Sequence, residues 1–232
     1  MKAFLLAAGN GTRLRPLTDS CPKCLLPIRG KPLLEIWLDN CRQAGIDEVL
    51  VNVHSLPEKI REFAAQRNHS LKLRIAEEPQ LLGSAGTLAE NRSFIGSDEP
   101  FFILYGDVLT NVNLRAMLQF HQGKKDVVAT LAIHQVDEPR HCGIVGTDEH
   151  SMVRSFVEKP ENPESNWAFS GIMIATPAVF EAIPAHRPAD IGFHLLPGLT
   201  GCMAAYRISE YLLDIGTLNN YTRAQSSWPG LG

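Results

Sequence analysis

A glycine turn followed by basic side chains stands near the start of the chain. An apolar stretch runs into Gly9-Asn10-Gly11-Thr12-Arg13, and Lys23 follows shortly after. Glycine lets backbone N–H groups approach an anion closely, and the planar guanidinium of Arg13 suits phosphate oxygens. The spacing matches neither a Walker A motif nor the dinucleotide-binding Gly-x-Gly-x-x-Gly. A glycine turn alone is often only a turn, so the phosphate-binding hypothesis depends on the two cations beside it.

Two aspartates, far apart in the sequence, each follow an apolar run. Asp107 ends the run at Tyr105-Gly106, and Asp214 stands between Leu213 and Ile215. In isolation, either would be interpreted as a turn or helix-capping residue. Mg²⁺, however, binds through one or two carboxylates and shares its other oxygens with substrate phosphates. The pair therefore predicts a Mg²⁺ site.

Two more segments carry polar groups that suit a sugar or a base. Glu158-Lys159 precedes Pro160, and it offers a carboxylate for hydroxyl groups and an ammonium for a phosphate. Adjacent residues of a strand point to opposite faces, and the proline can redirect the pair toward one ligand. The alternative is an exposed edge on which the two residues form salt bridges. The segment 77–87 follows an expected strand and opens a helix, so its backbone amides are candidates to read a base or a sugar ring.

The five cysteines indicate free thiols, because their number is odd and they are scattered. Cys21-Pro22-Lys23-Cys24 forms a C-x-x-C. Without a second pair at metal-binding spacing, it is weak support for zinc or redox chemistry.

The elements that must position these residues alternate between strand and helix up to residue 133. Such alternation predicts a doubly wound α/β fold, in which ligands bind beyond the carboxyl ends of the strands. The expected strands are 2–8, 48–53, 71–76, 101–105 and 127–133, and the expected helices are 32–44, 58–66 and 112–121.

The pattern changes after residue 140, where strands become short. We interpret this half as a continuation of the sheet with a small inserted β-subsheet, and the whole as one domain, 1–225, with a loose tail, 226–232. The expected strands are 144–145, 153–157, 168–175, 204–208 and 211–213, and the expected helical segments are 177–183, 191–199 and 217–226.

Composition excludes several partners for this 232-residue chain. A net charge of −3 provides no basic field for a nucleic-acid backbone. No apolar run approaches the roughly 20 residues that a bilayer-spanning helix needs. We therefore expect a cytoplasmic protein that binds neither nucleic acid nor membrane, and we leave a homo-oligomer open.

Taken together, these motifs resemble those of sugar-1-phosphate nucleotidylyltransferases, and most of all mannose-1-phosphate guanylyltransferases and related bacterial hexose or heptose enzymes. The resemblance covers about residues 2–225. It implies a Rossmann-like, doubly wound mixed sheet of the GT-A-like nucleotidyltransferase type, Mg²⁺ as cofactor, and a nucleoside triphosphate and a sugar-1-phosphate as substrates. The matching segments are 6–13, 22–28, 30–33, 83–86, 106–107, 142–143, 158–160, 169–171 and 214–217.

The resemblance also implies a role for individual residues. Arg13 and Lys23 would be catalytic, and Asp107 and Asp214 would bind the metal. The nucleotide would contact Leu6, Ala7, Ala8, Gly9, Gly11, Thr12, Glu78, Gly83 and Ser84, and the sugar phosphate would contact Gly143, Glu158, Lys159, Ser170 and Gly171.

Some positions depart from the family pattern. Ser170 stands where asparagine is usual, which puts one sugar contact in doubt, and Cys142 replaces a common tyrosine. A carboxylate at Glu78 suits the two donors on the guanine edge, which favours GTP. Three alternatives are a UTP-dependent uridylyltransferase, a non-catalytic regulatory homologue and a glycosyltransferase. The sequence has no D-x-D triplet, which speaks against the glycosyltransferase.

Overall fold

The computed structural model describes residues 1–67, 71–96 and 99–231. The chain divides into two compact units, each with its own internal contacts. The first unit comprises residues 1–81, 104–115 and 210–232, and the second comprises 82–103 and 116–209. Most helices and strands belong to one unit. Strand β6 (Phe101–Tyr105) and helix α4 (Leu114–Gln122) contribute residues to both.

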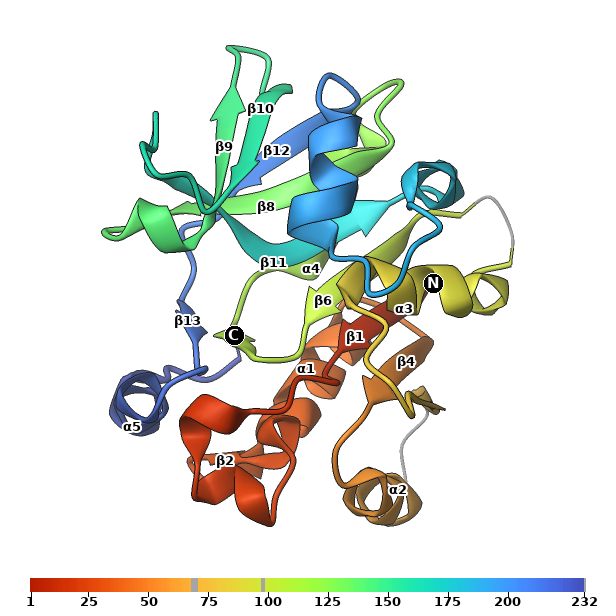
Figure 1. The fold of residues 1–232 in the computed structure, drawn as a ribbon, viewed down its shortest axis with the longest axis vertical. Coiled ribbons are helices and arrows are strands. Elements are labelled where there is room, and N and C mark those ends of the chain that lie inside the picture. Colours follow the sequence, from red (N-terminus) through yellow and green to blue (C-terminus); the bar gives the residue numbers. More distant parts are fainter. Residues whose placement is uncertain (68–70, 97–98, 232) are drawn as a thin grey trace. The chain divides into compact units, whose positions relative to one another are not determined.

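Parallel strands form the centre of the first unit. Strand β4 pairs in parallel with β1, which lies beside it in Figure 1, and with β5 on its other side. Both faces of β4 are covered, since every residue from Val49 to Val53 is buried, as expected for a parallel strand. The elements of this unit are β1 (Lys2–Leu6), β2 (Pro27–Ile28), β3 (Lys31–Pro32), α1 (Leu33–Gln43), β4 (Glu48–Val53), α2 (Pro57–Ala65), β5 (Lys72–Glu77), β7 (Val108–Thr110), β13 (Leu212–Asp214) and α5 (Leu218–Ser227).

Helix α1 shows how the sequence sets these boundaries. Pro32 precedes its first residue, and Gly45 follows its end with φ +78°, a left-handed conformation that favours glycine. Its apolar face is buried, including Trp37 and Leu38. The helix expected over 32–44 is confirmed.

Two short antiparallel pairs complete the first unit. Strand β7 pairs with β13, with Asp214 opposite Val108. Strand β2 pairs with β3. The pairing of β7 with β13 has a direct consequence for the predicted metal ligands, because it sets Asp214 beside the residue that follows Asp107.

Strands of both directions make up the second unit. Strand β8 pairs antiparallel with β11 and parallel with β12, while β9 and β10 pair antiparallel. The mixed α/β class is therefore confirmed. The elements are α3 (Ser84–Glu90), β8 (Ala129–Gln135), β9 (Gly143–Thr147), β10 (Val153–Glu158), β11 (Trp167–Ala175) and β12 (Met203–Arg207).

Two helical segments of this unit differ from a regular α-helix. Pro177–Ala182 is a 3-10 helix, and Ile191–Leu195 is a π-helical turn that continues into the 3-10 helix Leu196–Leu199. The expectation of helical segments near 177–183 and 191–199 is confirmed in place, with a tighter or wider winding than an α-helix. The π-turn carries an exposed aromatic ring, that of Phe193.

The end of the chain is packed as far as the structure describes it. Helix α5 continues to Ser227, and Trp228 is 5% exposed with its ring against Tyr211. Residue 232, part of the expected tail 226–232, lies outside the described residues. The single-domain boundary at residue 225 stays a prediction. No helix in the described part of the chain is long and apolar enough to cross a membrane.

Candidate active site

The glycine turn after β1 opens onto a cavity of about 260 Å³ within the first unit. The cavity collects eight of the residues proposed from the sequence, together with four that were not proposed. Ala8 does not line it and is itself buried, at 8% exposed. The lining residues are Leu6, Ala7, Gly9, Asn10, Gly11, Thr12, Arg13, Lys23, Cys24, Gly106, Asp107 and Gly216.

The two glycines of the turn differ in their conformation and in what surrounds them. Gly11 has φ +61°, and a Cβ there would lie 2.9 Å from Cγ2 of Thr18, whose hydroxyl donates to the Gly11 carbonyl. Gly9 has neither constraint, because a Cβ there would meet nothing within 4 Å. The fold itself explains Gly11, whereas the open space around Gly9 is available to a ligand.

Gly106 lets the end of β6 lie against β1. Its amide donates to the Leu6 carbonyl at 2.8 Å, and a Cβ would lie 3.0 Å from that same oxygen. Asp107 therefore leaves the strand end directly beside the glycine turn. The sequence predicts that the loops after Ala8, Ala76 and Tyr105 share one crevice. The loops after Ala8 and Tyr105 line this cavity, whereas none of its lining residues comes from the loop after Ala76.

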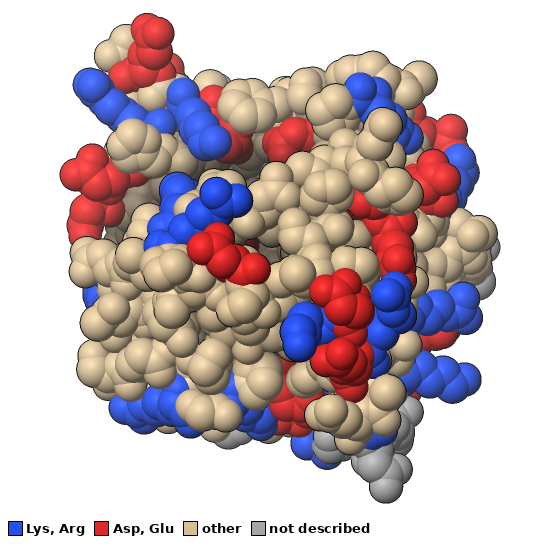
Figure 2. All heavy atoms as spheres, turned by 60° about the horizontal axis from the view of Figure 1, so that its bottom comes forward, with Lys and Arg blue, Asp and Glu red and all other residues tan. Residues whose placement is uncertain are grey.

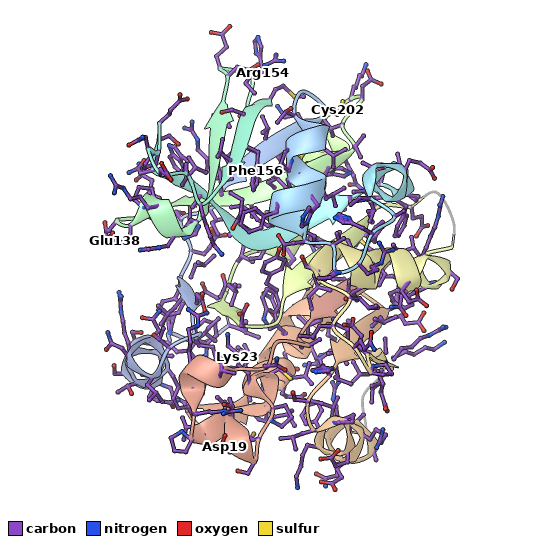
Figure 3. All side chains as sticks on the ribbon, viewed as in Figure 1. Asp19, Lys23, Glu138, Arg154, Phe156 and Cys202 are labelled. Atoms are coloured by element: carbon purple, nitrogen blue, oxygen red, sulfur yellow. The ribbon has the colours of Figure 1, made fainter. Side chains whose placement is uncertain are left out.

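Lys23 links the two aspartates. Its Nζ donates to Oδ2 of Asp107 at 2.7 Å and lies 4.0 Å from Oδ1 of Asp214. The Lys23 side chain is only 10% exposed, and it comes from a 3-10 turn in the segment between β1 and α1 (Figure 3). The amide of Ile215 donates to the Asp107 carbonyl at 3.0 Å, which fixes the two carboxylate-bearing segments to each other.

The surroundings of Asp214 favour an added positive charge. Partial removal from water, followed by the negative charge of Asp107, raises the pKa of Asp214, while Lys23 and Arg13 act in the opposite direction. The amide of Gly216 donates to Oδ1 of Asp214 at 2.6 Å. A Cβ at Gly216 would lie 2.7 Å from that carboxylate oxygen and 2.8 Å from Nη2 of Arg13. Glycine thus leaves the room in which Arg13 approaches Asp214.

These carboxylates fit a magnesium ion that depends on its substrate for further ligands. Among the residues that the structure describes, no group of three or more His, Cys, Asp or Glu side chains could hold a metal. Asp107 and Asp214 nevertheless lie within 4.0 Å of one nitrogen atom, so one cation can serve both. Two carboxylates completed by phosphate oxygens and waters are typical of Mg²⁺ sites.

Glu78 is held in place by a residue that the sequence analysis missed. It is 4% exposed, and its Oε1 accepts from Nδ2 of Asn52 at 2.8 Å. Oδ1 of Asn52 in turn accepts from the amide of Ala7 at 2.7 Å. An asparagine inside the buried strand β4 was itself the signal, because a buried amide needs partners. Asn52 connects the glycine turn to the expected base-reading carboxylate.

The sugar-phosphate candidates lie in the second unit, where glycines surround Glu158. A Cβ at Gly143 would lie 2.6 Å from Oε2 of Glu158, and a Cβ at Gly192 would overlap the same oxygen. Burial raises the pKa of Glu158; the positive charge of Lys159 opposes this, and the negative charge of Asp190 adds to it. The ammonium of Lys159 lies 4.0 Å from Oε1 of Glu158.

The start of α3 is closed by a neighbouring loop. The amides of Ala85 and Gly86 both donate to the Ala189 carbonyl, at 2.9 and 3.1 Å. These two amides are therefore occupied, and the idea that they read a base or a sugar is not supported. Gly83 has φ +78°, and a Cβ there would overlap the backbone of Ala189.

The hydroxyl groups of Ser84 and Ser170 also have protein partners. Ser84 Oγ donates to Oδ2 of Asp190 at 2.9 Å, and Ser170 Oγ donates to the Ala132 carbonyl at 2.8 Å. Ser170 is 3% exposed, and Gly171 follows it with φ +77°. Their assignment to the nucleotide and the sugar stays a prediction.

The cysteines form no disulfide bond. All five thiols are free. The charged side chains on the surface are of both signs. On the face shown in Figure 2, groups of Lys and Arg side chains and groups of Asp and Glu side chains lie between broad uncharged areas.

Comparison with known proteins places this geometry in a family. The sequence profile of the family described as "Nucleotidyl transferase" matches residues 2–229. Mannose-1-phosphate guanylyltransferase 1 of Arabidopsis thaliana is 35% identical, over 95% of this chain and 63% of its own length. UTP–glucose-1-phosphate uridylyltransferase of Synechocystis sp. is 34% identical, over 97% of this chain and 62% of its own length. The chain thus spans less than two thirds of these relatives.

Solved structures share the fold. UDP-glucose pyrophosphorylase complexed with UDP-glucose gives a TM-score of 0.84 at 24% identity, covering 97% of this chain and 96% of the other. HddC from Yersinia pseudotuberculosis complexed with GMP-PN gives 0.80 at 24% identity, with 97% of both chains covered. These likenesses confirm the expected fold. Since the family profile covers almost every residue from the glycine turn to the end of α5, the chain belongs to the nucleotidyl transferase family.

Proposed function

We propose that the protein transfers a nucleoside monophosphate from a nucleoside triphosphate to a sugar-1-phosphate, releasing pyrophosphate. The observation that carries this proposal is the cavity in which Arg13, Lys23, Asp107 and the glycine turn meet. Its cations suit a triphosphate, and its two carboxylate-bearing segments suit the Mg²⁺ that accompanies one. The curated relatives named above act on a sugar-1-phosphate according to their names, which supports the same class of substrate.

The reaction needs positioning and charge stabilisation more than proton transfer. A phosphate oxygen of the sugar-1-phosphate attacks the α-phosphorus in line, the bond to the bridging oxygen of the β-phosphate breaks, and pyrophosphate leaves with that electron pair. The attacking phosphate is already ionised, so no general base is required. Fixed positive charges lower the barrier because negative charge is shared over the transferring group and the leaving group.

The residues in and beside the cavity have separate parts in this scheme. Arg13 and Lys23 neutralise the triphosphate, and the backbone at Gly9 lies close to its oxygens. Asp107, in the lining, and Asp214, two residues before the lining residue Gly216, would hold Mg²⁺, which would supply positive charge to the phosphate oxygens. Lys23 is already beside both carboxylates, so it stays near the reacting phosphates when it exchanges a carboxylate for a phosphate oxygen.

The groups around Glu158 bind the sugar phosphate in this proposal. The Glu158 carboxylate accepts hydrogen bonds from sugar hydroxyls, and the Lys159 ammonium pairs with the phosphate. Gly143 has no Cβ, which lets the Glu158 carboxylate pack against its backbone.

We further propose GTP as the nucleotide and mannose-1-phosphate or a related hexose- or heptose-1-phosphate as the acceptor. The carboxylate of Glu78, 4% exposed and outside the lining of the cavity, is of the type that accepts from the N1–H and the N2 amino group of guanine. Asn52 holds one of its oxygens by a hydrogen bond of 2.8 Å, which orients the group. UTP is the second candidate, because one relative is named as a uridylyltransferase.

Pyrophosphate release with a panel of substrates tests the proposal. The purified chain is incubated with GTP, UTP, dTTP, CTP or ATP, Mg²⁺ and the 1-phosphates of mannose, glucose, N-acetylglucosamine or a heptose. We expect release with GTP and mannose-1-phosphate or a heptose-1-phosphate, and a Glu78→Gln variant should lose preference for GTP over UTP. Fastest release with UTP would overturn the choice of base, and no release with any pair would overturn the activity itself.

A further inference from the structure

An exposed aromatic ring stands beside the Glu158–Lys159 pair. Among the described residues, the large apolar side chains that are more than a third exposed are Leu17, Leu81, Val157, Phe193 and Leu218. Phe193 is the aromatic one, and it is 53% exposed. Single exposed apolar residues are ordinary on a protein surface and need no function. The neighbours of Phe193 distinguish it from an ordinary exposed residue.

The backbone that carries Phe193 is held rigidly. Its amide donates to Oδ1 of Asp190 at 3.0 Å, and Oδ2 of Asp190 accepts from Ser84 Oγ at 2.9 Å. Ser84 Oγ also accepts from the Ile191 amide at 2.7 Å. The amide of Asp190 donates to Nδ1 of His194 at 2.8 Å. Both carboxylate oxygens of Asp190 thus fasten the π-turn Ile191–Leu195 in place, while the ring that it carries is left in solvent.

The ring is directed at the phosphate-binding candidate. The ammonium of Lys159 lies 5.6 Å from the centroid of the Phe193 ring, within the range of a cation–π interaction. Lys159 is itself 55% exposed, so its long side chain would otherwise sample many rotamers. Contact with the ring favours positions of the ammonium beside the π-turn.

The residue before Phe193 packs its backbone against the carboxylate of Glu158, whose side chain is 16% exposed. A Cβ at Gly192 would overlap Oε2 of Glu158 and lie 2.8 Å from its Cδ. An aromatic face, an ammonium and a largely buried carboxylate are therefore brought together at the π-turn. A pyranose ring has the complementary surface, because its C–H groups form an apolar patch and its hydroxyl groups lie around the edge. The 1-phosphate of an uncharged pyranose can use all three groups at once.

We propose that Phe193 is a positioning and specificity residue of the sugar-phosphate site. Its ring holds the ammonium of Lys159 in place and packs against the C–H face of the uncharged pyranose ring of the sugar-1-phosphate, while the backbone of Gly192 lies against the Glu158 carboxylate that accepts from the hydroxyl groups. The inference rests on the proposed function, since it names the substrate class of the same site. It assigns to the π-turn a role that neither the glycine turn nor the two aspartates supply.

Steady-state kinetics with separate KM values for the two substrates tests the inference. Phe193→Leu keeps an apolar side chain and removes the π face, and Phe193→Tyr keeps the face. We expect Phe193→Leu to raise the KM for the sugar phosphate about two- to fivefold, the range of an exposed cation–π contact, with kcat and the KM for the nucleotide unchanged. Phe193→Tyr should restore the wild-type KM. Leu218→Ala removes an exposed apolar side chain of the first unit and serves as the matched control.

Each result has one meaning. An unchanged KM for the sugar phosphate in Phe193→Leu, in an enzyme whose wild type turns over, would overturn the inference and leave the proposed function intact. Parallel changes in kcat and in both KM values would also overturn it, because they indicate a general structural effect. If the wild type neither releases pyrophosphate nor binds mannose-1-phosphate in a calorimeter, both the proposed function and the inference fail.

Discussion

Lys23 and Asp107 are 84 positions apart in the sequence, and their side chains meet at 2.7 Å beside the glycine turn. The contact depends on two local devices. A 3-10 turn presents Lys23, and Gly106 lets Asp107 emerge next to β1. The pairing of β7 with β13 then sets Asp214 on the same cation, at 4.0 Å. An ammonium that already bridges two carboxylates is well placed to be exchanged against Mg²⁺ and phosphate oxygens.

The first prediction concerns Gly216, which leaves room for Arg13. A methyl group in Gly216→Ala would lie 2.8 Å from Nη2 of Arg13 and 2.7 Å from the carboxylate of Asp214. Both atoms are the ends of movable side chains, so the fold should tolerate the change while the guanidinium moves. We expect kcat/KM to fall about tenfold or more, with an unfolding free energy within about 1 kcal/mol of wild type.

Pyrophosphate release and a denaturant titration measure the two quantities. Gly198→Ala is the matched control, because a Cβ at Gly198 would meet nothing within 4 Å. A Gly216→Ala variant as active as the Gly198→Ala control would show that the position of Arg13 does not matter.

The second prediction separates a glycine that the fold needs from one that a ligand needs. Gly83→Ala must accommodate φ +78° and an overlap with the backbone of Ala189, so we expect it to cost about 3 kcal/mol or more of stability. Gly9→Ala has open space, and its stability should change by less than about 0.5 kcal/mol. Its affinity for the nucleotide should nevertheless fall about tenfold, since the added methyl group keeps phosphate oxygens away from the backbone.

Chemical denaturation and nucleotide titration by calorimetry distinguish these effects. If Gly9→Ala bound GTP as tightly as the wild type, the triphosphate would have to approach the turn elsewhere than at Gly9.

The sequence predicts those parts of the fold that depend on local pattern. Strand β4, expected over 48–53, is found at those residues because a buried apolar run leaves little choice. The three residues of β7 were missed, since their partner β13 lies about a hundred positions later and no local pattern marks the pairing. Short strands are stabilised by their partners, so the residues alone say little about them.

The same distinction applies to the candidate site. Arg13, Lys23 and Asp107 could be named from their types and neighbours, and one cavity collects them. Asn52 was missed because its role is to bridge Ala7 and Glu78, which depends on contacts between strands. Phe193 was missed for a related reason, since a π-turn and a distant carboxylate, Asp190, determine where its ring lies.

The third prediction concerns stability at acidic pH. His121 is 5% exposed, its Nδ1 lies 2.8 Å from the hydroxyl oxygen of Thr130, and burial lowers its pKa below the ordinary value. Burial also lowers the pKa of His134. Above the ordinary histidine pKa of about 6.5, these side chains are neutral in both the folded and the unfolded chain, and the effect of their titration on the stability is absent. Below it, the unfolded chain takes up the proton that the native state resists, so stability falls as the pH decreases.

Denaturant titrations between pH 8 and pH 5 measure this loss. Each histidine contributes at most about 1.4 kcal/mol per pH unit. His121→Gln keeps a hydrogen-bonding side chain and does not titrate, so its curve should be flatter than that of the wild type. Identical slopes for the two proteins would contradict the assignment to His121.

The fourth prediction concerns the C-x-x-C pair that flanks Lys23. Burial raises the pKa of Cys24 to about 12, and burial also raises the pKa of Cys21. The thiolate is the reactive form, so Cys24 should be nearly inert at pH 8. We expect a thiol reagent to label exposed Cys202 rapidly in the native protein and Cys24 only after unfolding. Rapid labelling of Cys24, detected by mass spectrometry of peptides, would reopen a redox role for the pair.

The most direct test of the nucleotidyl-transfer site compares two aspartate variants of the first unit. Asp107→Asn removes the charge that faces Lys23, and Asp19→Asn removes a 55% exposed carboxylate that pairs with Arg15 (Figure 3). The measurement is the rate of pyrophosphate release from the cognate nucleotide and sugar-1-phosphate in Mg²⁺, with thermal unfolding as the check on folding. We expect Asp107→Asn to lose at least about 100-fold in kcat and to stay folded, and Asp19→Asn to keep wild-type activity. A folded Asp107→Asn variant that releases pyrophosphate at the wild-type rate would contradict the assignment of Asp107 to the nucleotidyl-transfer site.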